Sequence, residues 1–251
     1  MTTVTAPLAG RRILLARRSD PQWHVALTAA GAQVDQVAFL ERQPQPSHAL
    51  DLVPQRLSTG EISWLVATSA HTLIACAALG HPWARLVPAS VRVAAVGPAS
   101  AAAVRAALGR VDLVPELGTG STALAECFPE GPGRVLIPGA AVWADDLPDV
   151  LSARGWTVER IVVYATRPVR SLPDPVVDRW HTGGYDLLVA TSGSVARAAA
   201  ALLGTEGAVV VLGSAGGRVA REVGFAPVAE AAAATPGDVV RAAARLLQSS
   251  P

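Results

Sequence analysis

The same five residues, LVATS, occur twice in this sequence, at positions 65–69 and 188–192. Each copy ends a short apolar run and precedes a segment of helical composition, HTLIACAAL in one case and GSVARAAAALL in the other. This pattern is typical of a buried strand that leads into a helix. The Thr-Ser pair then falls at the helix start, where a hydroxyl either caps the helix or helps to bind an anion.

The sequence around the two copies is duplicated as well. Each copy follows a strand, a helix and a second strand, and each precedes a strand, a glycine, a helix, a short strand and a last helix. Thr68 and Thr191 are 191 − 68 = 123 residues apart, and Gly97 and Gly213 are 213 − 97 = 116 residues apart. The similar offsets indicate a duplicated unit with small loop differences.

Strands rich in Val, Leu and Ile that alternate with helices are typical of a parallel sheet covered by helices on both faces. We therefore predict an α/β protein with two similar lobes, each a parallel sheet flanked by helices. Ligands of such sheets bind at the carboxyl ends of the strands. The two LVATS turns are expected at this edge, one in each lobe.

The composition narrows the possible chemistry. The 251 residues carry a formal net charge of +1, which argues against a general nucleic-acid binder. The sequence contains no lysine, which excludes Schiff-base catalysis and the lysine-containing phosphate loop. We expect Cys76 and Cys127 to be buried packing residues, and the histidines, none of which form a pair at metal-ligand spacing, to lie on the surface or in loops. We therefore expect no metal site. We also expect no membrane partner and a cytoplasmic protein, because no apolar run is long enough to span a bilayer and the N-terminus lacks a secretory signal.

Three further patterns have simple structural interpretations. GTGST (118–122) lacks the lysine of a phosphate loop, so a glycine turn before a helix is favoured. Asp145 and Asp146 are expected in the first turn of a helix, where carboxylates interact favourably with the helix dipole. TSGSV (191–195) lacks the glycine-x-serine-x-glycine sequence of serine hydrolases.

Taken in order, several stretches resemble the uroporphyrinogen-III synthase family. They are LLARR, GAQVDQVAFLE, LVATSAHTL and VAAVGPASAAAVRAALG, followed by LIPG, LPDVLSARGWTVERIVVYATRP, LVATSGSVA and TPGDVVRAA. Each stretch is short, but together they cover essentially the whole chain, and VYATRP after GWTVERI is the most telling.

The resemblance implies that the lobes are not the two halves of the sequence. One lobe would comprise residues 1–38 and 168–251, and the other residues 39–167. Strands near 34–41 and 157–168 would form a two-stranded linker between them.

The resemblance also implies a reaction. Members of the family close the linear tetrapyrrole hydroxymethylbilane to uroporphyrinogen III, with loss of water and inversion of ring D and without a cofactor or metal. Without an enzyme the substrate closes to the uninverted isomer, so catalysis must select one geometry of closure. The substrate's carboxylates suit helix N-termini, hydroxyl groups and arginines. The expected partner is this small molecule, and the expected state is a monomer.

Matching the motifs residue by residue gives one catalytic and seven substrate-binding candidates. Tyr164 matches a tyrosine proposed to assist departure of the hydroxyl group, although packing on a linker strand explains it equally well. The binding candidates are Arg17, Thr68, Ser69, Ser100, Ser192, Ser194 and Ser214. The serines are also compatible with capping alone, and Arg17 with a solvated surface. Family members often carry a Thr pair where this chain has Ala215 and Gly216, so Ser214 or backbone N–H groups would take over their role.

A different class of protein would show a similar pattern. Two duplicated α/β lobes also suit a non-enzymatic binding protein or a sensor for a small polyanionic ligand. Tyr164 in its YATRP context discriminates between these hypotheses, because a binding protein has no need for it.

Overall fold

The computed structural model describes residues 6–18, 21–143 and 147–248, so Asp145 and Asp146 lie outside the described residues. Contacts within the chain divide it into two compact units. Unit 1 consists of Met1–Glu41 and Arg167–Pro251, and unit 2 consists of Arg42–Thr166. No helix in the described ranges is both long and apolar enough to cross a membrane.

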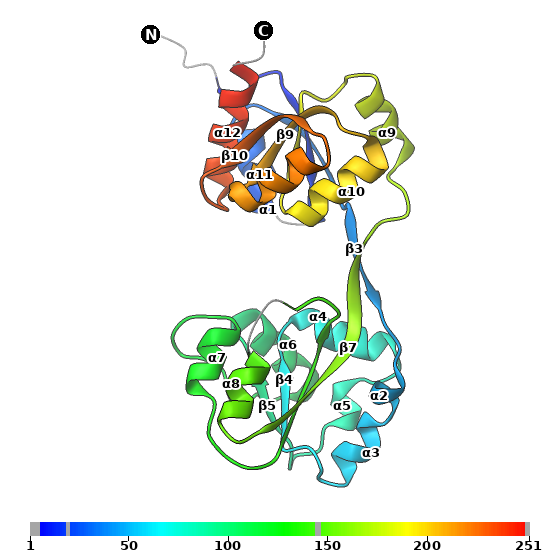
Figure 1. Cartoon of the computed structure of the whole chain (residues 1–251), viewed down its shortest axis with the longest axis vertical. Coiled ribbons are helices and arrows are strands. Elements are labelled where there is room, and N and C mark those ends of the chain that lie inside the picture. Colours follow the sequence, from blue (N-terminus) through cyan, green and yellow to red (C-terminus); the bar gives the residue numbers. More distant parts are fainter. Residues whose placement is uncertain (1–5, 19–20, 144–146, 249–251) are drawn as a thin grey trace. The chain divides into compact units, whose positions relative to one another are not determined.

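Unit 1 is built on a five-stranded sheet in which all neighbouring strands are parallel. In sheet order the strands are β10 (Ala226–Ala231), β9 (Glu206–Leu212), β8 (Leu187–Ala190), β1 (Arg12–Ala16) and β2 (Gln33–Val37). The helices are α1 (Pro21–Ala29), α9 (Asp174–His181), α10 (Gly193–Leu203), α11 (Gly213–Glu222) and α12 (Pro236–Gln248). Strands β1 and β2, from the start of the chain, thus lie in one sheet with strands from its C-terminal third, drawn in yellow to red colours in Figure 1.

Strand β1 shows how this sheet is covered on both faces. Leu14 and Ala16 pack into a core with residues of α9, α10 and α11. Ile13 and Leu15 point the other way, into a core with residues of α1 and α12. Because successive side chains of a strand alternate between faces, a strand buried on both faces needs an uninterrupted apolar run such as ILLA.

Unit 2 has a second five-stranded sheet. In sheet order its strands are β3 (Leu40–Pro44), β7 (Thr157–Pro168), β6 (Arg134–Ala140), β4 (Trp64–Ala67) and β5 (Arg92–Ala95). The helices are α2 (His48–Asp51), α3 (Val53–Ser58), α4 (Ala70–Ala78), α5 (Trp83–Leu86), α6 (Pro98–Leu108), α7 (Ser121–Cys127) and α8 (Leu147–Ala153). Leu65 and Ala67 of β4 face the core that includes α2 to α6, and Trp64 and Val66 face the core that includes α7 and α8. The predicted α/β class, with parallel sheets flanked by helices, is confirmed.

The chain passes from unit 1 to unit 2 along β3 and returns along β7. The backbone N–H of Gln45 donates to the Val163 carbonyl at 2.9 Å, and that of Val169 donates to the Phe39 carbonyl at 3.0 Å. Residue numbers therefore rise along one strand and fall along the other, so this pair is antiparallel. The expected linker segment near 34–41 is shifted, because residues up to Val37 already belong to β2, in the sheet of unit 1.

Candidate active site at the carboxyl edges of the two sheets

Each sheet has a point at which the direction of its connections reverses. In unit 2, β4 connects through α4 toward β5 on one side, and β6 connects through α8 to β7 on the other. In unit 1, β1 connects through α1 to β2, whereas β8 connects through α10 to β9. The carboxyl ends of the two strands at such a switch point frame the crevice in which open α/β sheets bind ligands.

The switch point of unit 2 carries the first LVATS turn. Ser69 is the N-cap of α4, with extended backbone angles, and its Oγ accepts a hydrogen bond from the backbone N–H of His71 at 3.1 Å. Thr68, directly after β4, is half-buried. Its Oγ1 would lie 3.5 Å from a Cβ built on Gly139, which shows that the turn packs against the end of the neighbouring strand β6.

An aromatic side chain lies at the same switch point. The ring of Trp143 packs on Gly139 so closely that a Cβ there would lie 2.8 Å from it. The guanidinium of Arg160 on β7 lies over the Trp143 ring, 4.1 Å from its centroid, in a cation–π arrangement. Glycine is therefore needed at position 139 for the indole to lie against the strand.

Tyr164 reaches this region through an irregularity in β7. The pairing register passes from Gly139–Val162 directly to Ala140–Tyr164, so Val163 is the extra residue of a β-bulge. Tyr164 is 7% exposed, and its ring packs edge-to-face with that of His71, with 4.9 Å between the centroids and 87° between the planes. The bulge thus brings the predicted catalytic tyrosine next to the α4 start that follows Thr68 and Ser69.

Ser100 is placed differently from the other candidates. It is the third residue of α6 and only 6% exposed. The GTGST loop folds against the start of this helix, because the Gly120 N–H donates to the Val96 carbonyl at 2.7 Å and the Thr119 side chain packs on Gly97. The loop therefore packs on the residues that directly precede α6, the helix that carries Ser100.

The switch point of unit 1 carries the second LVATS turn. Ser192 is the N-cap of α10, and its Oγ accepts a hydrogen bond from the Val195 N–H at 3.3 Å. Ser192 and Ser194 are both exposed. Arg17, directly after β1, is half-buried, and its guanidinium lies 5.1 Å from the centroid of the Trp23 ring. The guanidinium thus contacts a buried indole at the carboxyl end of β1.

Helix α11 begins at the end of the next strand, β9. Ser214 is its second residue and is exposed. Among the residues that the structure describes, no side chain caps this helix, so its first N–H groups are left for another partner. Gly216 packs on Val211, and a Cβ at Gly217 would lie 2.0 Å from the Glu230 carboxylate. The two glycines therefore let α11 lie close to β9 and β10.

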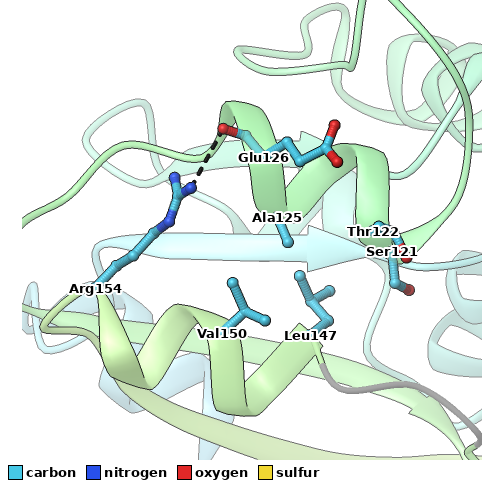
Figure 2. A pocket seen from close by; sticks show the side chains of 7 residues that line it. All are labelled: Ser121, Thr122, Ala125, Glu126, Leu147, Val150 and Arg154. Carbon is cyan, nitrogen blue, oxygen red and sulfur yellow. Dashed lines mark hydrogen bonds between the residues drawn. The ribbon is translucent and has the colours of Figure 1, made fainter.

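A pocket lies between α7 and α8 of unit 2 (Figure 2). It has a volume of about 140 Å³ and is lined by Ser121, Thr122, Ala125, Glu126, Leu147, Val150 and Arg154, none of which is a predicted site residue. The Arg154 guanidinium donates a hydrogen bond to the backbone carbonyl of Glu126, at 3.4 Å.

The GTGST stretch forms the glycine turn before α7 that the sequence predicts. Gly118 and Gly120 both have positive φ angles.

Glu159 and Cys76 are two groups of unit 2 whose pKa values are clearly shifted. Near the amino end of β7, hydrogen bonds from Arg56 hold the pKa of Glu159 below its usual value. Burial raises the pKa of the Cys76 thiol to about 11, so this cysteine is protonated at neutral pH and serves packing, as predicted. The prediction is wrong for Cys127, which is exposed because it lies at the end of the short helix α7. Within the described residues, no cluster of three or more His, Cys, Asp or Glu side chains is arranged to hold a metal ion.

Comparison with known families decides what this arrangement belongs to. Residues 21–241 match the family described as uroporphyrinogen-III synthase HemD. The chain belongs to the uroporphyrinogen-III synthase family. No curated protein matches the sequence.

Solved structures of uroporphyrinogen III synthases share the fold. The enzyme from Helicobacter pylori is 16% identical, with a TM-score of 0.59, and the match covers 94% of this chain and 99% of that one. A mutant of the enzyme from Thermus thermophilus is 19% identical, with a TM-score of 0.53, and the match covers 96% of this chain and 100% of that one.

Two residues at the switch point of unit 2, His71 and Trp143, were not predicted from the sequence as part of the site. His71 was expected on the surface or in a loop, but it lies in the first turn of α4 with its ring on Tyr164. Its place two residues after a capping serine was the available signal. Trp143 carried no signal, because its contact with Gly139 depends on how the loop after β6 folds back.

Proposed function

We propose that this chain converts hydroxymethylbilane to uroporphyrinogen III, and that the helix starts at both switch points bind the carboxylates of the tetrapyrrole. The observation that carries the proposal is the equivalence of the two points. Each has a Thr-Ser turn after a fully buried strand, and each turn begins a helix capped by its serine. A role in carboxylate binding is therefore proposed for each switch point by itself.

The binding chemistry rests on hydrogen bonds to carboxylates. Thr68 and Ser194 offer hydroxyl groups, and the first turns of α10 and α11 offer backbone N–H groups and a partial positive charge. Ser69 and Ser192 accept hydrogen bonds from their own helices, and each still has its hydroxyl proton to donate. Ser214 stands beside the open start of α11. Arg17 adds a full charge, which strengthens hydrogen bonds to carboxylate oxygens.

Tyr164 is the proposed catalytic residue. Its ring is 7% exposed and packs against His71 in the first turn of α4, the helix that begins at the switch point of unit 2. The phenol donates its proton to the hydroxyl oxygen of the substrate as the carbon–oxygen bond breaks, so that water leaves. The adjacent electron-rich pyrrole supplies the electron pair that stabilises the resulting cation, which limits how much the acid needs to contribute.

The isomer of the product tests the proposal. Freshly prepared hydroxymethylbilane is added to the protein, and the products are oxidised and separated by isomer. We expect the type III isomer in excess. Formation of the type I isomer alone, at the rate seen without protein, would contradict the enzyme assignment and favour the two-lobe binding protein.

The proposal extends to the state of the protein. Both switch points are built from residues of one chain, so we infer that a monomer is active, and we infer a cytoplasmic location. Sedimentation velocity at assay concentrations should give a single species near 25.7 kDa.

A further inference from the structure

The orientation of the Tyr164 ring has a specific structural cause. In a regular strand the side chains of Val163 and Tyr164 would point to opposite faces of the sheet. Instead, Ile161, Val163 and Tyr164 all belong to the one core that β7 shares with α4, because the bulge at Val163 changes the alternation. The phenol ring is thereby directed toward the start of α4.

At the start of α4, His71 meets that ring. The backbone N–H of His71 is fixed by its hydrogen bond to the Ser69 Oγ, at 3.1 Å. Its imidazole lies edge-to-face with Tyr164, with the ring planes 87° apart. A chain of contacts therefore runs from the capping hydroxyl, through the His71 backbone and imidazole, to the phenol ring.

The phenol ring depends on packing for its orientation. The Tyr164 ring is 7% exposed and packs in the core that β7 shares with α4 and against the His71 imidazole, so ring contacts hold the direction in which the hydroxyl points. The bulge sets the position of the Tyr164 backbone, and the imidazole contacts the ring itself. A proton donor must lie within hydrogen-bond reach of the departing oxygen, so a small rotation of this ring reduces its contribution.

We propose that His71 is a positioning residue for Tyr164, which holds the phenol in the orientation that protonates the leaving hydroxyl. The inference rests on the proposed function. His71 acts through Tyr164, whose contribution is made in the transition state, so removal of the imidazole lowers kcat and leaves KM nearly unchanged. Edge-to-face aromatic pairs have modest interaction energies, which correspond to about a two- to tenfold change in rate.

A double-mutant cycle tests the inference. The variants are His71→Ala, His71→Phe, Tyr164→Phe and the double variant with His71→Ala and Tyr164→Phe. His71→Ala should lower kcat about two- to tenfold, with the type III isomer still formed. His71→Phe should restore most of the rate, since a phenyl ring can make the same edge-to-face contact. In the Tyr164→Phe background, His71→Ala should have no further effect on kcat.

Ile74→Ala is the matched control. Ile74 lies one turn further along α4 and is 61% exposed, so its truncation alters the same helix without touching the ring pair. Its kcat should equal that of the wild type. If His71→Ala does not fold, His71→Leu, which fills more space but has no ring, replaces it in the cycle with the same expected results.

Each contrary outcome has a distinct meaning. Equal losses from His71→Ala with and without the Tyr164 hydroxyl would show that His71 does not act through it, and would overturn the inference. A His71→Phe variant as slow as His71→Ala, with an altered pH–rate profile, would show that the imidazole itself transfers protons, and would also overturn it. If the wild type forms only the type I isomer, the proposed function and this inference fail together. If the wild type forms type III and the cycle is additive, only this inference fails.

Discussion

Ser69 and Ser192 occupy equivalent positions, each two residues after a strand of a different sheet. Each is the N-cap of the helix that follows a fully buried strand, and each accepts a hydrogen bond from the first turn of that helix, from the His71 N–H at 3.1 Å and from the Val195 N–H at 3.3 Å. A capping serine accepts a hydrogen bond at its hydroxyl oxygen, whereas a substrate-binding serine donates its hydroxyl proton. The two roles can therefore be separated by substitution.

Substitution of Ser192 by alanine and by glycine separates the roles. An N-cap Ser→Ala change costs about 1 kcal/mol of stability, whereas Ser→Gly costs only a few tenths. We therefore expect Ser192→Ala to lower the free energy of unfolding by about 1 kcal/mol and Ser192→Gly to be nearly as stable as the wild type. If the hydroxyl also binds substrate, both variants raise KM. A glycine variant with the wild-type KM would make Ser192 a cap alone.

Tyr164→Phe separates the chemistry of the phenol from its packing. Phenylalanine keeps the ring against His71 and removes only the hydroxyl. General acid catalysis is typically worth about a hundredfold to ten-thousandfold, and because the pyrrole already activates the leaving group, we expect a loss at the low end of that range or less. The product should remain type III, and the melting temperature should be close to that of the wild type. Unchanged turnover would make Tyr164 a packing residue, and a folded variant that releases only type I would mean that the phenol directs the inversion.

Arg17 and Arg18 form a natural pair for testing charge at the edge of unit 1. Both follow β1, but only Arg17 is half-buried and stacks on Trp23, while Arg18 is exposed. Arg17→Ala would remove a charge-assisted hydrogen bond to a substrate carboxylate. We therefore expect it to raise KM about tenfold. Arg18→Ala removes the same charge and should change KM much less. Equal increases would show that the substrate responds to net charge and not to a placed guanidinium.

The ion pair between Arg56 and Glu159 predicts how stability depends on pH. The guanidinium donates to both carboxylate oxygens, at 2.8 and 2.6 Å, and these bonds lower the pKa of Glu159 from its usual 4.5. A carboxyl group whose pKa is lowered by folding contributes stability above its unfolded pKa, and this is lost as pH falls through the folded value.

We therefore expect Glu159→Gln to lower the free energy of unfolding by about 1 kcal/mol at pH 7, with the difference shrinking below about pH 4.5. Urea denaturation at several pH values measures this. Glu61→Gln is the control, because Glu61 also contacts Arg56 but is more exposed, and its effect should be smaller. A difference between wild type and Glu159→Gln that stays constant down to pH 3 would contradict the account.

Much of the fold follows from local sequence. The apolar runs that become β1, β4, β6 and β8 are continuous because these strands are covered on both faces, and LVATS predicts a strand, a cap and a helix start wherever it occurs. The duplication predicted the similarity of the two units. The short strand predicted in each repeat shows where prediction from local sequence fails. It forms β10 in unit 1, but in unit 2 only a single bridge joins Ala94 and Leu113, where the Asp112 carboxylate accepts the Val93 N–H.

The sequence by itself determined the elements, their buried faces and the helix starts with hydroxyl groups, because these depend on side-chain pattern and on residues a few positions apart. Only the tertiary structure decided which of these residues meet. Tyr164 lies next to His71 because a bulge shifts the register of β7, and a register shift is set by pairing with β6 and not by the residues of the strand alone. Trp143 rests on Gly139 because a loop folds back on its own strand. Contacts of this kind join residues that are not linked by any local periodicity, so their partners exist only once the sheet has formed.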